Sequence, residues 1–385
     1  MAHIFSESDE FAPEWEPVRP GLILQAELDE RHLSQADLAA RMGVSKKHLN
    51  QVISGMATLS ADVALALERT MGPSAQFWLR MEADWRAAQV AKEAEIDLST
   101  QIPWLAHFPA EVIEGLGVVA RNAKPVERIN AILRHFGVSN PAAFDRVWVE
   151  PQQGYQLNAA FKRSSVFRID PYCTALWLRT AEIEAEEAAI GAPPYSAKLV
   201  RAAAAQLPEL TRMPPGETFR AMQKLLRKAG VILVFVPEIR DTRLSGVSLW
   251  LGSDRPMIAL TNRYRFVDAL WFSLAHEIAH ILLHLKRETF VDGGFTDDEI
   301  KNHLFVSEDA NGHEAAANDY AQNLLLAGTD PAVLKEIATP ADLRVLADRH
   351  RVSVTLLAGQ YGHQTGNWSK FGKLRERVNL LEAIG

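Results

Sequence analysis

Residues 266–285 read FVDALWFSLAHEIAHILLHL, and this stretch decides the fold of the C-terminal part of the chain. Its length and nearly continuous apolar content predict a helix buried inside a domain. His276 and His280 are four residues apart, so they lie one above the other on a single helical face. Burying two imidazoles and the adjacent carboxylate of Glu277 is costly unless a metal ion or other side chains pair with them. Of these two alternatives, the apolar surroundings favour the metal ion.

The spacing of His276, Glu277 and His280 suits the hydrolysis of peptide bonds. Two imidazoles one helical turn apart can bind a single Zn²⁺, and Glu277 stands beside them as a candidate general base. A zinc ion with an open coordination position polarises a carbonyl group and lowers the pKa of water. We therefore expect a zinc metallo-endopeptidase with one Zn²⁺ per chain.

A third protein ligand is expected from the next helix, predicted over residues 313–326. Glu314, Ala317, Ala321 and Leu324 share one face of that helix, and the two alanines allow close packing against the histidine helix. This packing would deliver Glu314 to the metal. A site of two histidines and a glutamate also accepts Mn²⁺. Weaker candidates for the third ligand are His284, His313 and Asp319.

Three predicted strands precede the histidine helix, over residues 231–236, 247–251 and 257–261. They make the C-terminal region α+β, with a small sheet in a chain that is otherwise mostly α. If residues 257–261 form an edge strand, an extended peptide could pair with them by β-augmentation. The equal alternative is that these residues are an internal strand of the sheet.

The quoted helix and the segment EAAANDYAQNLLLA, residues 314–327, together resemble the ImmA/IrrE family of zincin-like metallopeptidases. The family pattern is His-Glu-x-x-His followed by Glu-x-x-Ala-x-x-aromatic-Ala. The resemblance covers roughly residues 215–330 and implies that His276, His280 and Glu314 bind zinc and that Glu277 is the base. The family usually has a proline soon after the double leucine of this helix. Here Ala327 and Gly328 come first and Pro331 follows later, a difference that concerns the end of the helix.

The N-terminal region carries a second pattern, LSQADLAARMGVSKKHLNQVISG, at residues 33–55. Ser34 and Ser45 are good N-caps for two short helices, Gly43 provides the turn between them and Gly55 ends the second. Cap, turn and apolar spacing all agree with a helix-turn-helix, in which the second helix enters the DNA major groove.

Candidate DNA contacts follow from this geometry. Lys46, Lys47 and Asn50 would face the major groove from the second helix, with Ser45 at its start, and Gln35 could hold a phosphate. Residues 19–70 contain six Lys/Arg and six Asp/Glu, so the domain is not basic overall. A protein-interaction module therefore remains the alternative to DNA binding.

Residues 20–85 resemble the Xre family, in particular the HigA antitoxin type. The resemblance covers the whole stretch from PGLILQ to EADW, with the capped helix pair at its centre. It implies binding to double-stranded operator DNA as a homodimer.

The bulk composition is that of a multidomain protein of a reducing compartment. The chain has 385 residues, a net charge of −7 and a single cysteine, Cys173, which forms no intrachain disulfide. The acidic, proline-containing start does not resemble a signal peptide, and we expect a cytoplasmic protein without a membrane segment. The expected parts are an acidic leader (1–18), a helix-turn-helix domain (19–98), a helical connector (99–214) and a zincin-like peptidase domain (215–385).

Three functional hypotheses follow. The first is a peptidase and DNA-binding regulator that cleaves a repressor or antitoxin protein in a stress, toxin–antitoxin or mobile-element circuit. The second is a HigA-like antitoxin or transcriptional repressor whose metallopeptidase domain is structural or senses a ligand. The third is self-cleavage in the linker near residues 88–103, motivated by the presence of both domains in one chain.

Overall fold

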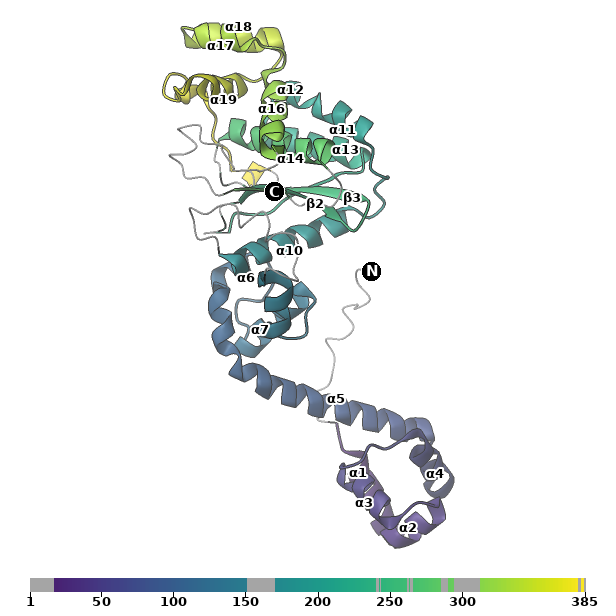
Figure 1. Ribbon diagram of the computed structural model, residues 1–385. Coiled ribbons are helices and arrows are strands. Elements are labelled where there is room, and N and C mark those ends of the chain that lie inside the picture. The colour runs from purple at the N-terminus through teal and green to yellow at the C-terminus, as the bar shows by residue number, and fades with distance from the viewer. Residues whose placement is uncertain are drawn as a thin grey trace. The chain divides into compact units, whose positions relative to one another are not determined.

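The computed structural model describes residues 17–150, 170–239, 242, 244–261, 263, 266–284, 290–293, 312–379 and 382–383. The chain divides into two units, Met1–Pro103 and Trp104–Gly385 (Figure 1). Most of the predicted acidic leader, residues 1–16, lies outside the described residues.

The N-terminal unit folds through its capped turns. Its elements are the helices α1 (Pro20–Glu30), α2 (Gln35–Met42), α3 (Lys46–Ser54), α4 (Ala61–Met71) and α5 (Ala75–Thr100). The Ser34 hydroxyl accepts a hydrogen bond from the Asp37 amide, and the Ser45 hydroxyl accepts one from the His48 amide. Gly43 (φ 70°) closes the turn between α2 and α3, in the left-handed region that glycine tolerates. The predicted helix-turn-helix is confirmed.

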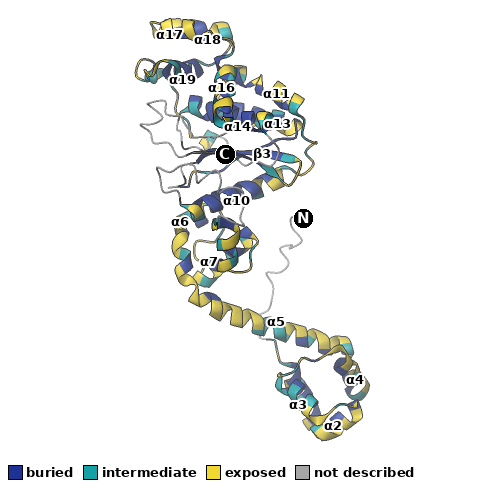
Figure 2. Cartoon of the chain, in the orientation of Figure 1, coloured by how far each residue is buried: buried dark blue, intermediate teal, exposed yellow. Residues whose placement is uncertain are grey.

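The core of this unit lies among α1, α2, α3 and α4, with Leu38, Leu49 and Leu67 fully enclosed. Helix α5 contributes Trp78 at its start, and most of its later residues are exposed (Figure 2). The boundary predicted between residues 98 and 99 falls inside α5.

The C-terminal unit begins with short helices around an aromatic cluster. These are η2 (Ile102–His107), most of which lies in this unit, α6 (Ala110–Gly115), α7 (Pro125–Phe136), α8 (Pro141–Phe144) and the π-helix η3 (Asp145–Val149), followed by α10 (Pro171–Ala188). Edge-on ring contacts join Phe136 to Phe144 and to Trp148, and Trp104 to Phe108.

A mixed sheet forms the centre of this unit. Its described strands are β1 (Ile232–Phe235), β2 (Leu244–Leu251), β3 (Arg255–Leu260) and β4 (Phe290–Gly293), in the order β1-β3-β2-β4. Strand β1 pairs with β3 in parallel, whereas β2 pairs antiparallel with both β3 and β4.

The prediction that residues 257–261 form an edge strand is wrong. The hairpin turn at Gly252 places β3 beside β2, and the parallel β1 covers its other side, with Ile232 opposite Met257. Strand β3 is therefore internal, which is the alternative that the sequence left open.

Helix α14 (Val267–Leu283) lies at the centre of the main hydrophobic core, against β2 and β3 (Figure 1). Around it are α11 (Ala197–Ala204), α12 (Leu207–Leu210), α13 (Pro215–Lys228), α16 (His313–Leu326), α17 (Pro331–Glu336), α18 (Pro340–His350) and α19 (Val354–Thr365). Val200 and Leu207 belong to the same core, so the core extends across the boundary predicted between residues 214 and 215.

Gly366 (φ 71°) terminates α19, and the described residues after it include a turn over 368–371, the short helix η4 (Gly372–Leu374) and the helical residues 382–383. Helix α16 ends where Ala327 (φ 50°) and Gly328 (φ 79°) take left-handed conformations, before Pro331 begins the next helix.

Replacing Gly21 by alanine should destabilise the N-terminal unit. A Cβ atom there would lie 1.9 Å from the carbonyl oxygen of Ile53, so α1 and the end of α3 would have to separate. Overpacking of this kind costs about 1–3 kcal/mol. Calorimetry of the full chain should show one transition at a lower temperature. The control is Gly115→Ala, where no atom lies within 4 Å of the new Cβ; equal melting of the two variants would contradict the prediction.

Candidate metal centre

Helix α14 places two histidines and a glutamate inside the protein. His276 and His280 are each 3% exposed and Glu277 is fully buried. The surrounding positions of the helix are apolar, which is why the whole turn enters the core instead of facing water. Polar groups at such positions require partners.

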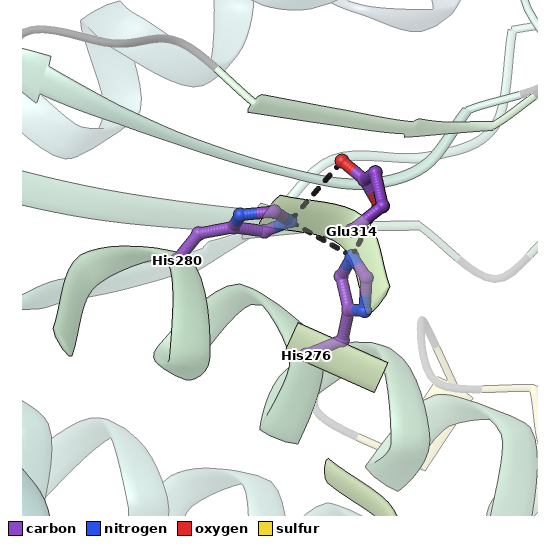
Figure 3. Close-up of side chains that lie close together, drawn as sticks. All are labelled: His276, His280 and Glu314. Carbon is purple, nitrogen blue, oxygen red and sulfur yellow. Dashed lines mark hydrogen bonds and ion pairs between the residues drawn. The ribbon is translucent and has the colours of Figure 1, made fainter. Parts of the chain in front are cut away.

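The third member of the cluster comes from α16. Glu314 Oε2 lies 3.2 Å from His276 Nε2, and Glu314 Oε1 lies 3.5 Å from His280 Nε2 (Figure 3). The two Nε2 atoms are 2.9 Å apart. Figure 3 shows both rings and the carboxylate pointing toward one common point. Sequence spacing alone had suggested this arrangement.

This donor set fits a metal ion. Ligand atoms of the three residues all lie within 4.8 Å of one another. Ligands bound tetrahedrally to zinc at about 2.0 Å are separated by about 3.3 Å, close to the separations seen here. Two imidazole nitrogens and a carboxylate also match zinc chemically, and they leave a fourth position open.

The protonation of the two rings favours metal binding. His276 Nδ1 lies 2.9 Å from Asn318 Oδ1, so the tautomer protonated at Nδ1 can donate to this acceptor and leaves the Nε2 lone pair directed toward Glu314. Burial lowers the pKa of His280 well below its usual range, and the nearby rings of His276, His284 and His313 add to this effect. The neutral imidazole is the form that binds metals.

Small side chains let α16 approach α14 closely. Ala317 and Ala321 are fully buried, and Ala321 lies in the main core. A larger side chain at either position would hold the helices apart and withdraw Glu314.

The weaker ligand candidates lie beside the cluster but outside it. The ring of His284 lies 4.2 Å from that of His313 and 5.0 Å from that of His280, measured between centroids. His284 follows the last residue of α14, so it leaves the helical path of the other two histidines. Asp319 is exposed.

Two residues of the site were not predicted. Asn318 follows Glu314 by one helical turn, a spacing that could have identified it. Gly246 on β2 faces Glu277, and a Cβ atom there would lie 3.0 Å from Glu277 Oε1. The lack of a side chain at position 246 leaves room for the Glu277 carboxylate. No sequence pattern within β2 predicts this role of Gly246.

The candidate DNA-binding residues gather at the start of α3. Lys46, Lys47 and Asn50 are exposed, and Ser45 caps the helix. Asn50 Nδ2 donates to Gln35 Oε1, and Gln35 Nε2 donates to Gln25 Oε1. This chain of amides holds Asn50 in place on the outer face of α3.

Comparison with known families agrees with both units. A family model described as an IrrE N-terminal-like domain matches residues 231–359, which include the whole metal cluster. A model described as helix-turn-helix matches residues 24–78. The C-terminal unit therefore contains a domain of the ImmA/IrrE metallopeptidase family, and the N-terminal unit contains a helix-turn-helix domain.

Three relatives that match about a fifth of the chain are short bacterial proteins. An uncharacterized HTH-type transcriptional regulator, YddM, of Escherichia coli (strain K12) is 31% identical over 78 residues, 20% of this chain and 83% of the relative. Virulence-associated protein I of Dichelobacter nodosus is 35% identical over 80 residues, 74% of its length. Virulence-associated protein A' of the same organism is 28% identical over 68% of its length.

The helix-turn-helix domain supports DNA binding, and membership of a peptidase family suggests a protein substrate. None of the described helices is both long and apolar enough to cross a membrane.

Asn318→Ala should weaken metal binding. Without the amide oxygen, His276 loses the partner that fixes its ring and tautomer, and such losses typically cost about 10- to 100-fold in metal affinity. Competition with a chromophoric chelator measures the zinc dissociation constant. Asn323→Ala, an exposed position on the same helix, is the control. Equal affinities of the two variants would refute the role given to Asn318.

Proposed function

We propose that this protein is a zinc-dependent endopeptidase and DNA-binding regulator. The observation that supports the peptidase is the convergence of His276, His280 and Glu314 with the buried Glu277 next to them in sequence. In this proposal the first three bind one Zn²⁺, or Mn²⁺, and Glu277 is the general base. A purely structural metal site would need no such base.

In this proposal the chain's own residues have separate roles in peptide hydrolysis. Bound zinc supplies Lewis-acid polarisation of the scissile carbonyl and lowers the pKa of water. Glu277 takes the proton of the attacking water and returns it to the leaving amine. Gly246 leaves the space that the Glu277 carboxylate occupies, and Asn318 holds the His276 ring.

The substrate is proposed to be an extended segment of a protein. Among the described strands, β4 is an outer strand of the sheet, and it contacts α14. Strand β4 therefore replaces residues 257–261 as the candidate for pairing with a peptide. The resemblance to ImmA/IrrE peptidases suggests a repressor or antitoxin as the cleaved protein, in a stress, toxin–antitoxin or mobile-element circuit.

The N-terminal unit is proposed to read operator DNA through Lys46, Lys47 and Asn50, with Ser45 and Gln35 near the phosphates. A homodimer would place two α3 helices in successive major grooves. The exposed apolar residues of α5 (Phe77, Val90 and Ile96) offer a surface for the second copy. We propose a cytoplasmic location, because the proposed partner is operator DNA.

The second candidate function is that of an antitoxin-like repressor whose peptidase domain is structural or senses a ligand. The name of the Escherichia coli relative, a transcriptional regulator, favours it. The two candidates differ in what they require of Glu277, since only the peptidase needs its carboxylate.

Glu277→Gln should abolish peptidase activity while zinc remains bound, because the amide cannot accept a proton. A proteome-derived peptide library, incubated with the zinc-loaded full chain and read by mass spectrometry, should yield cleaved peptides with wild type only. We expect a loss of at least about 100-fold, within the range for general bases. Equal cleavage by both proteins, or by neither, would support the repressor.

Asn50→Ala should weaken operator binding by about 1–3 kcal/mol and relax sequence preference at one base position. The operator is first selected from random duplexes with the wild-type chain, and affinities are then measured at fixed salt. Asn323→Ala serves as control. Failure of wild type to enrich any sequence would point to a protein-interaction module.

A further inference from the structure

The first turn of the metal helix is held by a buried ion pair with the C-terminal segment of the chain. Arg375 Nε lies 3.1 and 3.0 Å from the two carboxylate oxygens of Asp268, and a terminal nitrogen of Arg375 lies 2.8 Å from Oδ2. The side chains are 12% and 4% exposed. Asp268 lies eight residues before His276, two turns along α14.

Little free space remains around the Asp268–Arg375 ion pair. A Cβ atom at Gly359 of α19 would lie 2.3 Å from Asp268 Oδ2, so the carboxylate occupies the space that a side chain would need. The Arg375 guanidinium lies 4.2 Å from the ring centre of Phe266 and 4.6 Å from that of Trp368. The Asp268 carboxylate and the Arg375 guanidinium are therefore both held in place by closely packed neighbours.

Backbone contacts continue this attachment. The amide of Val267, the first residue of α14, donates to the carbonyl oxygen of Glu376 at 3.0 Å. Phe266 and Arg377 form an antiparallel bridge. The segment that follows α19, residues 366–379, therefore satisfies a donor that the start of a helix leaves open.

A row of rings leads from the same segment to a metal-ligand candidate. Trp368 contacts His363 edge-on at 4.8 Å, His363 stacks on Phe272 at 5.3 Å, and Phe272 stacks on His276 at 6.3 Å, all between ring centres. A Cβ atom at Gly362 would lie 2.4 Å from Trp368, which shows how closely the indole is seated on α19.

We propose that Arg375 and Asp268 are positioning residues of the metal centre, through which residues 366–379 set the affinity of the site for zinc. The inference rests on the proposed function, because it assumes that the cluster binds zinc. The segment lies beyond residue 359, where the match to the family domain ends, so it would be a contribution of this chain beyond the matched domain.

The physical reason is the precision that a metal site requires. Ligands must be held within about 0.5 Å of their working positions by their supporting contacts. Two histidines on one helix keep their mutual spacing, but their distance to Glu314 on α16 depends on how α14 is placed along its axis. An anchor at the first turn and a stack of rings against His276 both restrict that movement.

The test compares zinc affinity of the full chain with that of Arg375→Met and of the double variant Asp268→Asn, Arg375→Met. The double variant leaves no unpaired buried charge, so it should fold even if the single variant does not. Lys373→Met, an exposed position in the same segment, is the charge control. Leu343→Ala, a buried residue of α18 in the same core, is the control for general loss of stability.

We expect both positioning variants to bind zinc about tenfold more weakly and to show faster amide hydrogen exchange in α14 of the metal-free protein. Leu343→Ala should lower the melting temperature without either change. Wild-type zinc affinity in the double variant would overturn this inference and leave the proposed function standing. Failure of wild type itself to bind zinc would overturn the proposed function and this inference with it.

Discussion

The structure of the C-terminal unit depends on one constraint: α14 buries two histidines and a glutamate in a core that offers them little water. Polar groups in that position need partners, and each neighbouring element contributes to meeting the need. Helix α16 brings Glu314 and Asn318, and its buried alanines allow it to come close. Strand β2 has a glycine, Gly246, opposite Glu277, which leaves room for the carboxylate. The arrangement leaves two imidazole nitrogens and a carboxylate directed at a single point.

The N-terminal unit fixes its recognition helix by similar means. The carbonyl oxygens at the end of α3 accept hydrogen bonds from Arg19 and Arg86, at Ser54 and Gly55 respectively. Glu82, mostly buried, accepts from Arg86 and from the Leu59 amide. Cationic groups at a helix C-terminus also interact favourably with its dipole. In both units, then, buried polar contacts hold rigid the helix that carries the candidate site.

Local patterns in the sequence predicted much of this. Capping serines and turn glycines predicted the helix-turn-helix, and the helix predicted over residues 313–326 is present with those bounds. The spacing of His276 and His280, followed by Glu314 with its alanines, anticipated the cluster. The features that the sequence did not predict depend on contacts between segments that are distant in sequence. The position of β3 inside the sheet follows from its parallel contact with β1, which no local pattern encodes. Gly246 and the Arg375–Asp268 pair join segments far apart in sequence, so neither has a periodic signal.

The central claim is that His276, His280 and Glu314 together form one metal site, and X-ray absorption at the zinc edge of the full chain tests it most directly. The account predicts about one zinc per chain, with two imidazole nitrogens and one carboxylate among its ligands at about 2.0 Å. The same spectrum from Glu314→Ala should be weak or lack the carboxylate. A folded, unstripped protein without zinc or manganese, or a zinc environment unchanged by Glu314→Ala, would contradict the claim.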